Sequence, residues 1–354
     1  GKIMIVVRAL YGLKSAGAAF RALLAETLHD IGYVPSRADP DVWLRPGVKP
    51  DGTEYYEMVL VYVDDVLAFS ADPMKTMKGI QDKFKLKDDK IEEPETYLGA
   101  ELSKMVTANG TECWTMSSEK YCKAAVQNVE TKLESQGKRL TNRCGSPLKS
   151  GYRPELDVLQ ELKAESLSYY QELIGILRWV VELGRVDILL ETLLMSAHLA
   201  MPRIGHLEAV IHMFGYLKEH PKRRLAFDPD HPPVDERAFT KYDWHDFYQG
   251  AKEAIPGDMP TPRGKSMSMH CFVDADLAGN TVTRRSQTGI LIFINRAPII
   301  WHSKKQNTVE ASTFGSEITA LKNAIELIES LRYKLRMFGV PVDGPTNIYC
   351  DNKA

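Results

Sequence analysis

Apolar residues in the first hundred positions recur first at helical spacing and then at strand-like spacing. The segment AAFRALLAETLHDIG (18–32) has apolar residues three and four positions apart, which predicts an amphipathic helix that ends at Gly32. The segment EYYEMVLVYVDDVLAFS (54–70) indicates two apolar strands separated by Asp64 and Asp65. We therefore expect a mixture of helix and strand in this part of the chain.

The middle of the chain favours helices. A short helix is predicted at EKYCKAAVQNV (119–129). In YYQELIGILRWVVELG (169–184) the apolar residues 170, 173, 174, 177, 180 and 181 fall on one helical face. Residues 228–266 are rich in Pro and Asp and poor in aliphatic side chains, which indicates a linker or an exposed insert.

The last ninety residues change pattern again. Three strands are predicted at MHCFVDAD (269–276), GILIFI (289–294) and PIIWHS (298–303), followed by a long helix over 314–338 and a strand at TNIYCD (346–351). Strands, then a helix, then a strand predict a mixed sheet with a helix packed against it. The expected fold class of the whole chain is α+β.

Composition narrows the class of protein. With 354 residues, 44% hydrophobic and 26% charged, the chain has ordinary globular composition and can bury real cores. A net charge of −2 excludes a uniformly basic nucleic-acid coat, but local basic grooves are compatible with it. Five Cys without a C-x-x-C pair argue against a zinc ribbon or a thioredoxin motif. No apolar run is long enough to predict a membrane span, so no membrane partner is expected.

Two sets of carboxylates are candidates for chemistry. Asp64 and Asp65 lie between two apolar strands, where adjacent like charges repel and a divalent metal would offset the repulsion. The alternative is an ordinary Asp-rich turn.

The second set lies near the C-terminus. Asp274 and Asp276 close a strand, Glu317 lies early in the long helix, and Asp351 ends the last strand. A sheet-plus-helix fold can bring such element ends together, as a two-metal nuclease requires. The alternative is a set of solvated acids, one of which stabilises a helix N-terminus.

Local charge is uneven. Residues 261–308 contain seven Lys or Arg and two acids, Asp274 and Asp276. A basic rim around carboxylates suits a phosphate backbone, and a solvated surface is the alternative.

Several segments, taken in order, resemble a known family. They are ALYGLKSAGAAF (9–20), VYVDDVLAFS (61–70), YLGAEL (97–102), FVDADLAG (272–279), PIIWHSKKQNTVEASTFGSEITAL (298–321) and IYCDNKA (348–354). Together they resemble the reverse transcriptase and RNase H region of copia-type LTR retrotransposon polyproteins. The resemblance implies a partial polymerase palm and thumb of the right-hand type, a helical connection and an RNase H-like mixed α/β domain. The implied domains are a palm (1–105), a mostly helical thumb and connection (106–227), a linker or insert (228–266) and a C-terminally truncated RNase H-like domain (267–354).

The resemblance also implies roles for individual residues. Asp64 would be the polymerase metal ligand and Asp65 its less direct companion, with Tyr62 against the primer end. Tyr11, Gly12 and Lys14 would contact template and nucleotide. Asp274, Glu317 and Asp351 would be the catalytic and metal-binding set of the nuclease. Asp276 is expected to be the poorer ligand, because it would point to the other face of the strand. The expected metal is Mg²⁺, with Mn²⁺ as the second candidate.

The implied function is RNA-directed DNA polymerisation with associated RNase H cleavage, both by two-metal phosphoryl transfer. The implied partners are an RNA template, a primer, dNTPs, an RNA–DNA hybrid and other polyprotein products (protease, integrase and capsid). The implied location is a cytoplasmic virus-like particle, and the nucleus for integration. An upstream palm aspartate and a fourth RNase H residue are expected outside this segment, so the segment alone is expected to be incomplete. The alternative is an inactive or domesticated retrotransposon remnant that at most binds nucleic acid.

Overall fold

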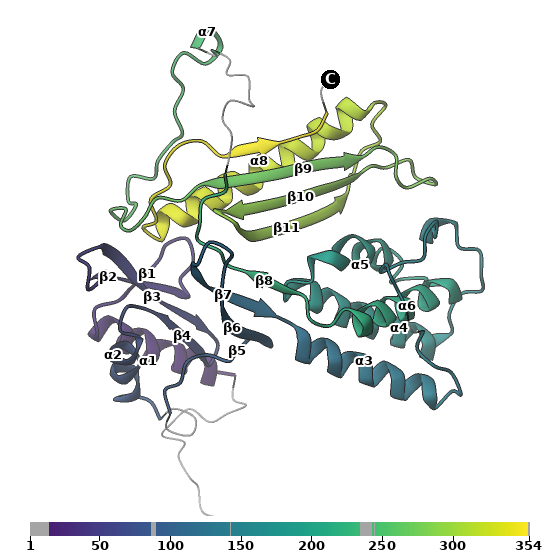
Figure 1. Ribbon diagram of the computed structural model, residues 1–354, viewed down its shortest axis with the longest axis horizontal. Coiled ribbons are helices and arrows are strands. Elements are labelled where there is room, and N and C mark those ends of the chain that lie inside the picture. The colour runs from purple at the N-terminus through teal and green to yellow at the C-terminus, as the bar shows by residue number, and fades with distance from the viewer. Residues whose placement is uncertain (1–13, 86–89, 142, 234–242, 244, 353–354) are drawn as a thin grey trace, which may run out of the picture. The chain divides into compact units, whose positions relative to one another are not determined.

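The computed structural model describes residues 14–85, 90–141, 143–233, 243 and 245–352, which fall into two compact units (Figure 1). The first unit comprises Gly1–Pro94, Val234–Met267 and Glu329–Asp343, and the second comprises Glu95–Pro233, Ser268–Ile328 and Gly344–Ala354. Helices and sheets occur in both units, so the predicted α+β class is confirmed. The predicted division into four consecutive domains stays a prediction.

An antiparallel sheet with two helices forms the N-terminal segment of the first unit. The sheet order is β1-β2-β3-β4, from Val34–Pro35, Val42–Val48, Glu54–Tyr62 and Asp65–Phe69. Helices α1 (Ala16–Asp30) and α2 (Pro73–Gln81) contribute Leu24, Leu28 and Ile80 to a core with residues of the sheet. Two predictions are confirmed: the helix ending before Gly32, which takes a φ of +86°, and the two strands around the paired aspartates.

A proline-rich segment of the first unit is held by charged contacts. Glu253 pairs with both Arg332 (2.7 Å) and Arg336, which are buried on the last turns of helix α8 (Thr313–Met337). Further along, Arg263 pairs with Glu54 at 2.8 Å. Residues 253–263 are therefore fixed to the rest of the unit at both ends.

The second unit begins with a four-stranded antiparallel sheet of order β5-β6-β7-β8. Its strands are Thr96–Tyr97, Ala100–Val106, Glu112–Ser117 and Arg224–Ala226. Between β7 and β8 the described residues form four α-helices, namely α3 (Glu119–Glu134), α4 (Ala164–Glu182), α5 (Leu189–Ser196) and α6 (Ile204–Glu219). The six positions predicted to share a face of α4 are its buried residues, which confirms that prediction.

A second sheet of the same unit has order β11-β10-β9-β12, and α8 runs across one of its faces (Figure 1). Its strands are β9 (Met269–Asp276), β10 (Gln287–Ile294), β11 (Ala297–Lys305) and β12 (Asn347–Tyr349). Strand β12 pairs in parallel with β9, and the other pairs are antiparallel. The predicted strands and the long helix are thus confirmed, with ends that differ by one to two residues at most positions.

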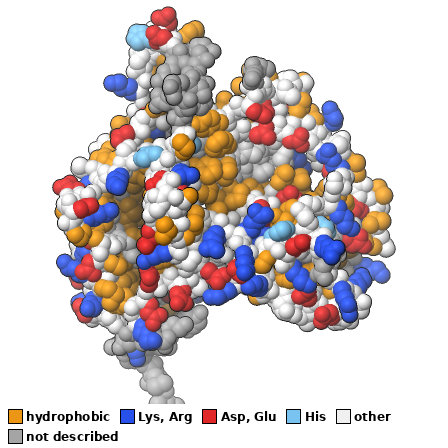
Figure 2. All heavy atoms as spheres, in the orientation of Figure 1, with side chains coloured by type: hydrophobic (Ala, Val, Ile, Leu, Met, Phe, Trp, Pro, Cys, Tyr) orange, Lys and Arg blue, Asp and Glu red, His pale blue; other side chains and the backbone are white. Residues whose placement is uncertain are grey.

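Charged side chains on the face shown in Figure 2 are interspersed rather than gathered into a coat of one sign. Within the described residues, none of the helices combines the length and the apolar character needed to cross a bilayer.

Candidate metal centre

Three carboxylates from separate elements meet in the second unit, at the end of the β11-β10-β9-β12 sheet where strand β9 ends. Asp274 lies near the end of β9, Glu317 in the second turn of α8, and Asp351 two residues after β12. Oxygen atoms of all three lie within 4.8 Å of one another. The strand register explains the meeting: Tyr349 is the partner of Phe272, so two further residues along each parallel strand bring the chain to Asp351 and Asp274.

The electrostatics of this cluster favour a bound cation. Glu317 is buried, and its burial, together with the charges of Asp274 and Asp351, raises its pKa above the ordinary value. The backbone N–H of Ala275 donates to Asp274 at 2.8 Å, and the Cys350 thiol donates to Glu317 Oε2 at 3.7 Å. Three carboxylates this close repel one another unless a positive charge lies between them. An all-oxygen donor set of this kind fits a hard divalent cation such as Mg²⁺ or Mn²⁺.

Asp276 lies on the same face of β9 as Asp274. Strand β9 continues through Asp276, and residues two apart on a strand share a face, whereas Val273 and Ala275, which alternate with them, are buried on the opposite face. The expectation that Asp276 points to the other face is therefore wrong. Asp276 still does not belong to the group of ligand atoms within 4.8 Å, which holds Asp274, Glu317 and Asp351.

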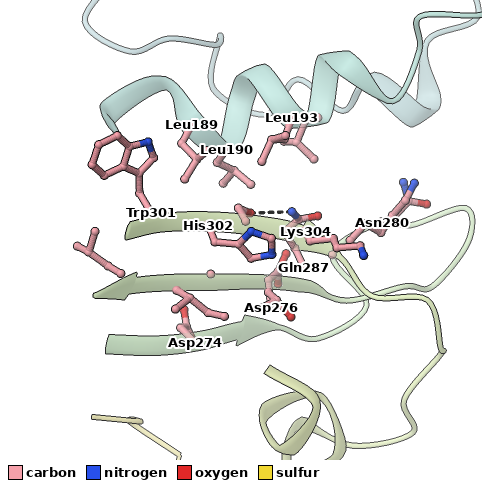
Figure 3. A pocket seen from close by; sticks show the side chains of 18 of the residues that line it. Leu189, Leu190, Leu193, Asp274, Asp276, Asn280, Gln287, Trp301, His302 and Lys304 are labelled. Atoms are coloured by element: carbon pink, nitrogen blue, oxygen red, sulfur yellow. Dashed lines mark hydrogen bonds between the residues drawn. The ribbon is translucent and has the colours of Figure 1, made fainter. Parts of the chain in front are cut away.

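A cavity of about 1090 Å³ adjoins this end of the sheet (Figure 3). Its sheet wall carries the acids Asp274, Asp276 and Asp351 together with Gln287 and Lys304. The opposite wall includes four leucines of α5, namely Leu189, Leu190, Leu193 and Leu194. The carboxylates thus face a space that is large enough for part of a polymeric substrate.

The first pair of aspartates is presented on an exposed hairpin. Tyr62 pairs with Asp65, so Val63 and Asp64 form the two-residue turn between β3 and β4. Val63 has a φ of +56°, a strained conformation for a β-branched residue that is typical of functional sites. Tyr62, Asp64 and Asp65 are all exposed. Among the described residues no third potential ligand joins the two aspartates, so the structure brings together the carboxylates of the predicted nuclease set but not a comparable group at the predicted polymerase site.

The remaining predicted contact residues lie at the start of the chain. Lys14 is exposed, two residues before α1, and Tyr11 and Gly12 lie outside the described residues. The sequence pattern gives no signal for Gln287 and a single one for Cys350. The one available signal for Cys350 is its place directly before Asp351 in a strand-like run.

Comparison with curated proteins aligns nearly the whole chain with transposon polyproteins. It is 26% identical over 348 residues to the retrovirus-related Pol polyprotein from transposon RE1 of Arabidopsis thaliana, covering 98% of this chain and 20% of that protein. The equivalent protein from transposon RE2 of Arabidopsis thaliana is 25% identical over 349 residues, again covering 98% and 20%. That from transposon TNT 1-94 of Nicotiana tabacum is 24% identical over 351 residues, covering 98% and 23%. The chain spans about a fifth of the length of these relatives. Neither a family model nor a solved structure matches it.

Proposed function

Because the chain is a relative of retrotransposon Pol polyproteins, as its sequence predicts, we propose that it carries an RNase H site of such a polyprotein and part of its reverse transcriptase palm. The observation that carries the proposal is the meeting of Asp274, Glu317 and Asp351 from three separate elements. A set of solvated acids would lower its mutual repulsion by pointing apart, whereas ligand atoms of these three stay within 4.8 Å of one another.

In the proposed nuclease, Asp274, Glu317 and Asp351 hold Mg²⁺ or Mn²⁺. When bound, the ion supplies Lewis acidity and an activated water for hydrolysis of a phosphodiester. The protein contributes rigid placement. The Ala275 N–H fixes one oxygen of Asp274, and the Cys350 thiol fixes one oxygen of Glu317, so the remaining oxygens are oriented for a ligand. The proposed substrate is the RNA strand of an RNA–DNA hybrid.

The hairpin is the proposed part of the polymerase. Asp64 and Asp65 hold metal, and Tyr62 lies against the primer end while an RNA or DNA template directs the addition of dNTPs. The strained turn at Val63 supports this role, since it holds both acids at an exposed tip. Tyr11, Gly12 and Lys14 complete the proposed nucleotide contacts. Other polyprotein products are the proposed partners, with the cytoplasmic particle and the nucleus as the proposed locations.

Metal binding tests the nuclease centre directly. Mn²⁺ binding to the full chain is measured by electron paramagnetic resonance, and cleavage of a labelled RNA–DNA hybrid is measured in parallel. Glu317→Gln is expected to abolish both the tight Mn²⁺ site and any cleavage, because it removes the central charge of the cluster. The matched control is Glu326→Gln, an exposed acid further along the same helix, which should change neither.

Each result has a defined meaning. Unchanged Mn²⁺ binding in Glu317→Gln overturns the assignment of the metal centre. Mn²⁺ binding that depends on Glu317 supports the metal centre, and cleavage that also depends on Glu317 favours the nuclease over the alternative, an inactive remnant that at most binds nucleic acid.

A further inference from the structure

The structure separates the basic residues of 261–308 into paired and unpaired groups. Arg263 pairs with Glu54 at 2.8 Å and Arg296 lies 3.6 Å from Asp228, so their charges are partly compensated. Arg284 and Arg285 are exposed and form no ion pair with any described residue. Their positive charge is therefore free for a ligand.

The two unpaired arginines belong to the loop that follows the carboxylate strand. This loop, residues 277–286, joins β9 to β10. The strand register places Gln287 opposite both Asp276 and Lys305. The loop, Lys304 and Lys305 therefore lie at the same end of the sheet, where β9 ends and β10 begins. The Gln306 N–H also donates to the Ser286 carbonyl at 2.8 Å, which ties the loop to the lysine-bearing strand end.

The distance from the loop to the metal centre is short on the scale of a nucleic acid. Arg285 is four residues from Gly289, the partner of Asp274, and these four residues span at most roughly 13 Å. Successive nucleotides of one strand of a duplex rise by about 3.4 Å. Gly289 and Asp274 lie on neighbouring strands, which adds about 5 Å, so the arginines lie within about six nucleotides of a phosphate held at the carboxylates.

The loop is held from outside the sheet by the segment before α4. Glu155 accepts hydrogen bonds from the Thr281 backbone N–H (3.1 Å) and hydroxyl (3.0 Å). Arg153 donates to the Gly279 carbonyl at 2.8 Å. Within the loop, the Asn280 side chain accepts from the backbone N–H and the hydroxyl of Thr283. An exposed ten-residue loop with this many fixed contacts has a defined shape.

We propose that residues 277–286, with Lys304 and Lys305, form a surface that binds the sugar–phosphate backbone of a nucleic acid beside the carboxylate centre. Arg284 and Arg285 contact the phosphates. Glu155 and Arg153 are positioning residues that hold the loop in its binding shape. The inference rests on the proposed function, because the backbone it binds is that of the proposed hybrid substrate.

The test of the contacts is the salt dependence of hybrid binding. The full chain is titrated into a fluorescein-labelled RNA–DNA hybrid in EDTA at 50–200 mM salt, so that metal binding and cleavage play no part. The double variant Arg284→Ala/Arg285→Ala is expected to reduce the slope of log K against log salt by about 1.4–1.8, since each lost phosphate contact removes about 0.7–0.9. Lys138→Ala/Arg139→Ala, with the same change of charge at another exposed site of the unit, is the control and should reduce the slope by less than half as much. An equal reduction in both doubles overturns the proposal.

The test of positioning uses the charge of Glu155. If only net charge mattered, Glu155→Ala and Glu155→Gln would both bind the hybrid more tightly, because each removes a negative charge. Positioning predicts weaker binding for Glu155→Ala, several-fold at 100 mM salt, and near-normal binding for Glu155→Gln, whose amide oxygen still accepts from Thr281. Tighter or unchanged binding of Glu155→Ala overturns the positioning role.

The two proposals fail separately. Loss of hybrid binding in the arginine double variant supports the surface even if the chain cleaves nothing. An unchanged slope in that variant removes the surface even if Glu317 proves to be essential for cleavage.

Discussion

A buried ion pair in the helical part of the second unit allows a quantitative prediction. Arg185 is 1% exposed, and its guanidinium donates to both oxygens of Asp187 at 2.8 and 2.9 Å. The Tyr216 hydroxyl also donates to Asp187, at 2.9 Å, and Arg223 lies 3.7 Å from it. Asp187 is partly open to solvent, with 22% of its side chain exposed. The buried Arg185 therefore depends more on Asp187 for its compensation than Asp187 depends on Arg185.

Asp187→Ala is expected to lower the free energy of unfolding by about 3–5 kcal/mol, because it leaves a buried guanidinium without its partner. In a unit of this size that loss corresponds to a fall in Tm of roughly 6–20 °C. Arg185→Met is expected to cost less, about 1–3 kcal/mol, since Asp187 keeps Tyr216 and can hydrate. The double variant should recover part of the loss, because no charge is then stranded.

Urea unfolding of the four proteins, followed by circular dichroism, gives the coupling energy as a double-mutant cycle. The control is Glu119→Ala, which breaks the partly exposed pair with Lys123 (2.6 Å) and should cost less than about 1 kcal/mol. The reasoning is refuted if Asp187→Ala costs no more than Glu119→Ala, or if Arg185→Met proves the costlier of the two single variants.

Three further predictions concern pH and backbone strain. Burial, with neighbouring positive groups, lowers the pKa of His198 to about 4, so the second unit should lose stability as pH falls from 6.5 to 4; the NMR titration of this ring should show the low value. Hydrogen bonds from two α8 arginines lower the pKa of Glu253 to about 2, so the stability it contributes is present above pH 4.5 and lost on acidification towards 2; acid unfolding of Glu253→Gln should lack that component. Gly339 and Gly344 both have a φ of +70°, but of the two only Gly339 has a neighbour, the Tyr56 ring, with which an added Cβ would clash. Gly339→Ala should therefore cost more than Gly344→Ala, which should cost about 1–2 kcal/mol, as urea unfolding of the two variants will measure.

The elements could be predicted from the sequence wherever one face is buried. The apolar face of α4 from Tyr170 to Val181 and the alternation of buried and exposed residues along β9 both indicate which side of the element packs against a core. The pairing of β7 with β8 could not be predicted in this way. Thr115 and Ala226 are about 110 residues apart, and the three-residue strand β8 is too short to carry a periodic signal.

The candidate site was only partly open to sequence reasoning. Element ends and family resemblance pointed to Asp274, Glu317 and Asp351, but their meeting depends on the register of β12 against β9, which no local pattern encodes. The same holds for Glu155, whose role depends on Thr281, 126 residues away. The positive φ of Val63 is also absent from the pattern, because β-branched residues normally favour extended backbone.

The segmented make-up of the first unit has a consequence for synthesis on the ribosome. Residues 329–343 complete this unit, yet they are made about 235 residues after its first segment ends at Pro94. At about 5–20 residues per second, that interval lasts roughly 12–50 s. Throughout it Arg332 and Arg336 are not yet made, so Glu253, which is synthesised late in this interval, lacks both of its partners. The α3–α6 helices, by contrast, come from one stretch of 101 residues and can pack as soon as it is released. The helices in the middle of the sequence are therefore expected to fold before the first unit, which contains the beginning of the chain, is complete.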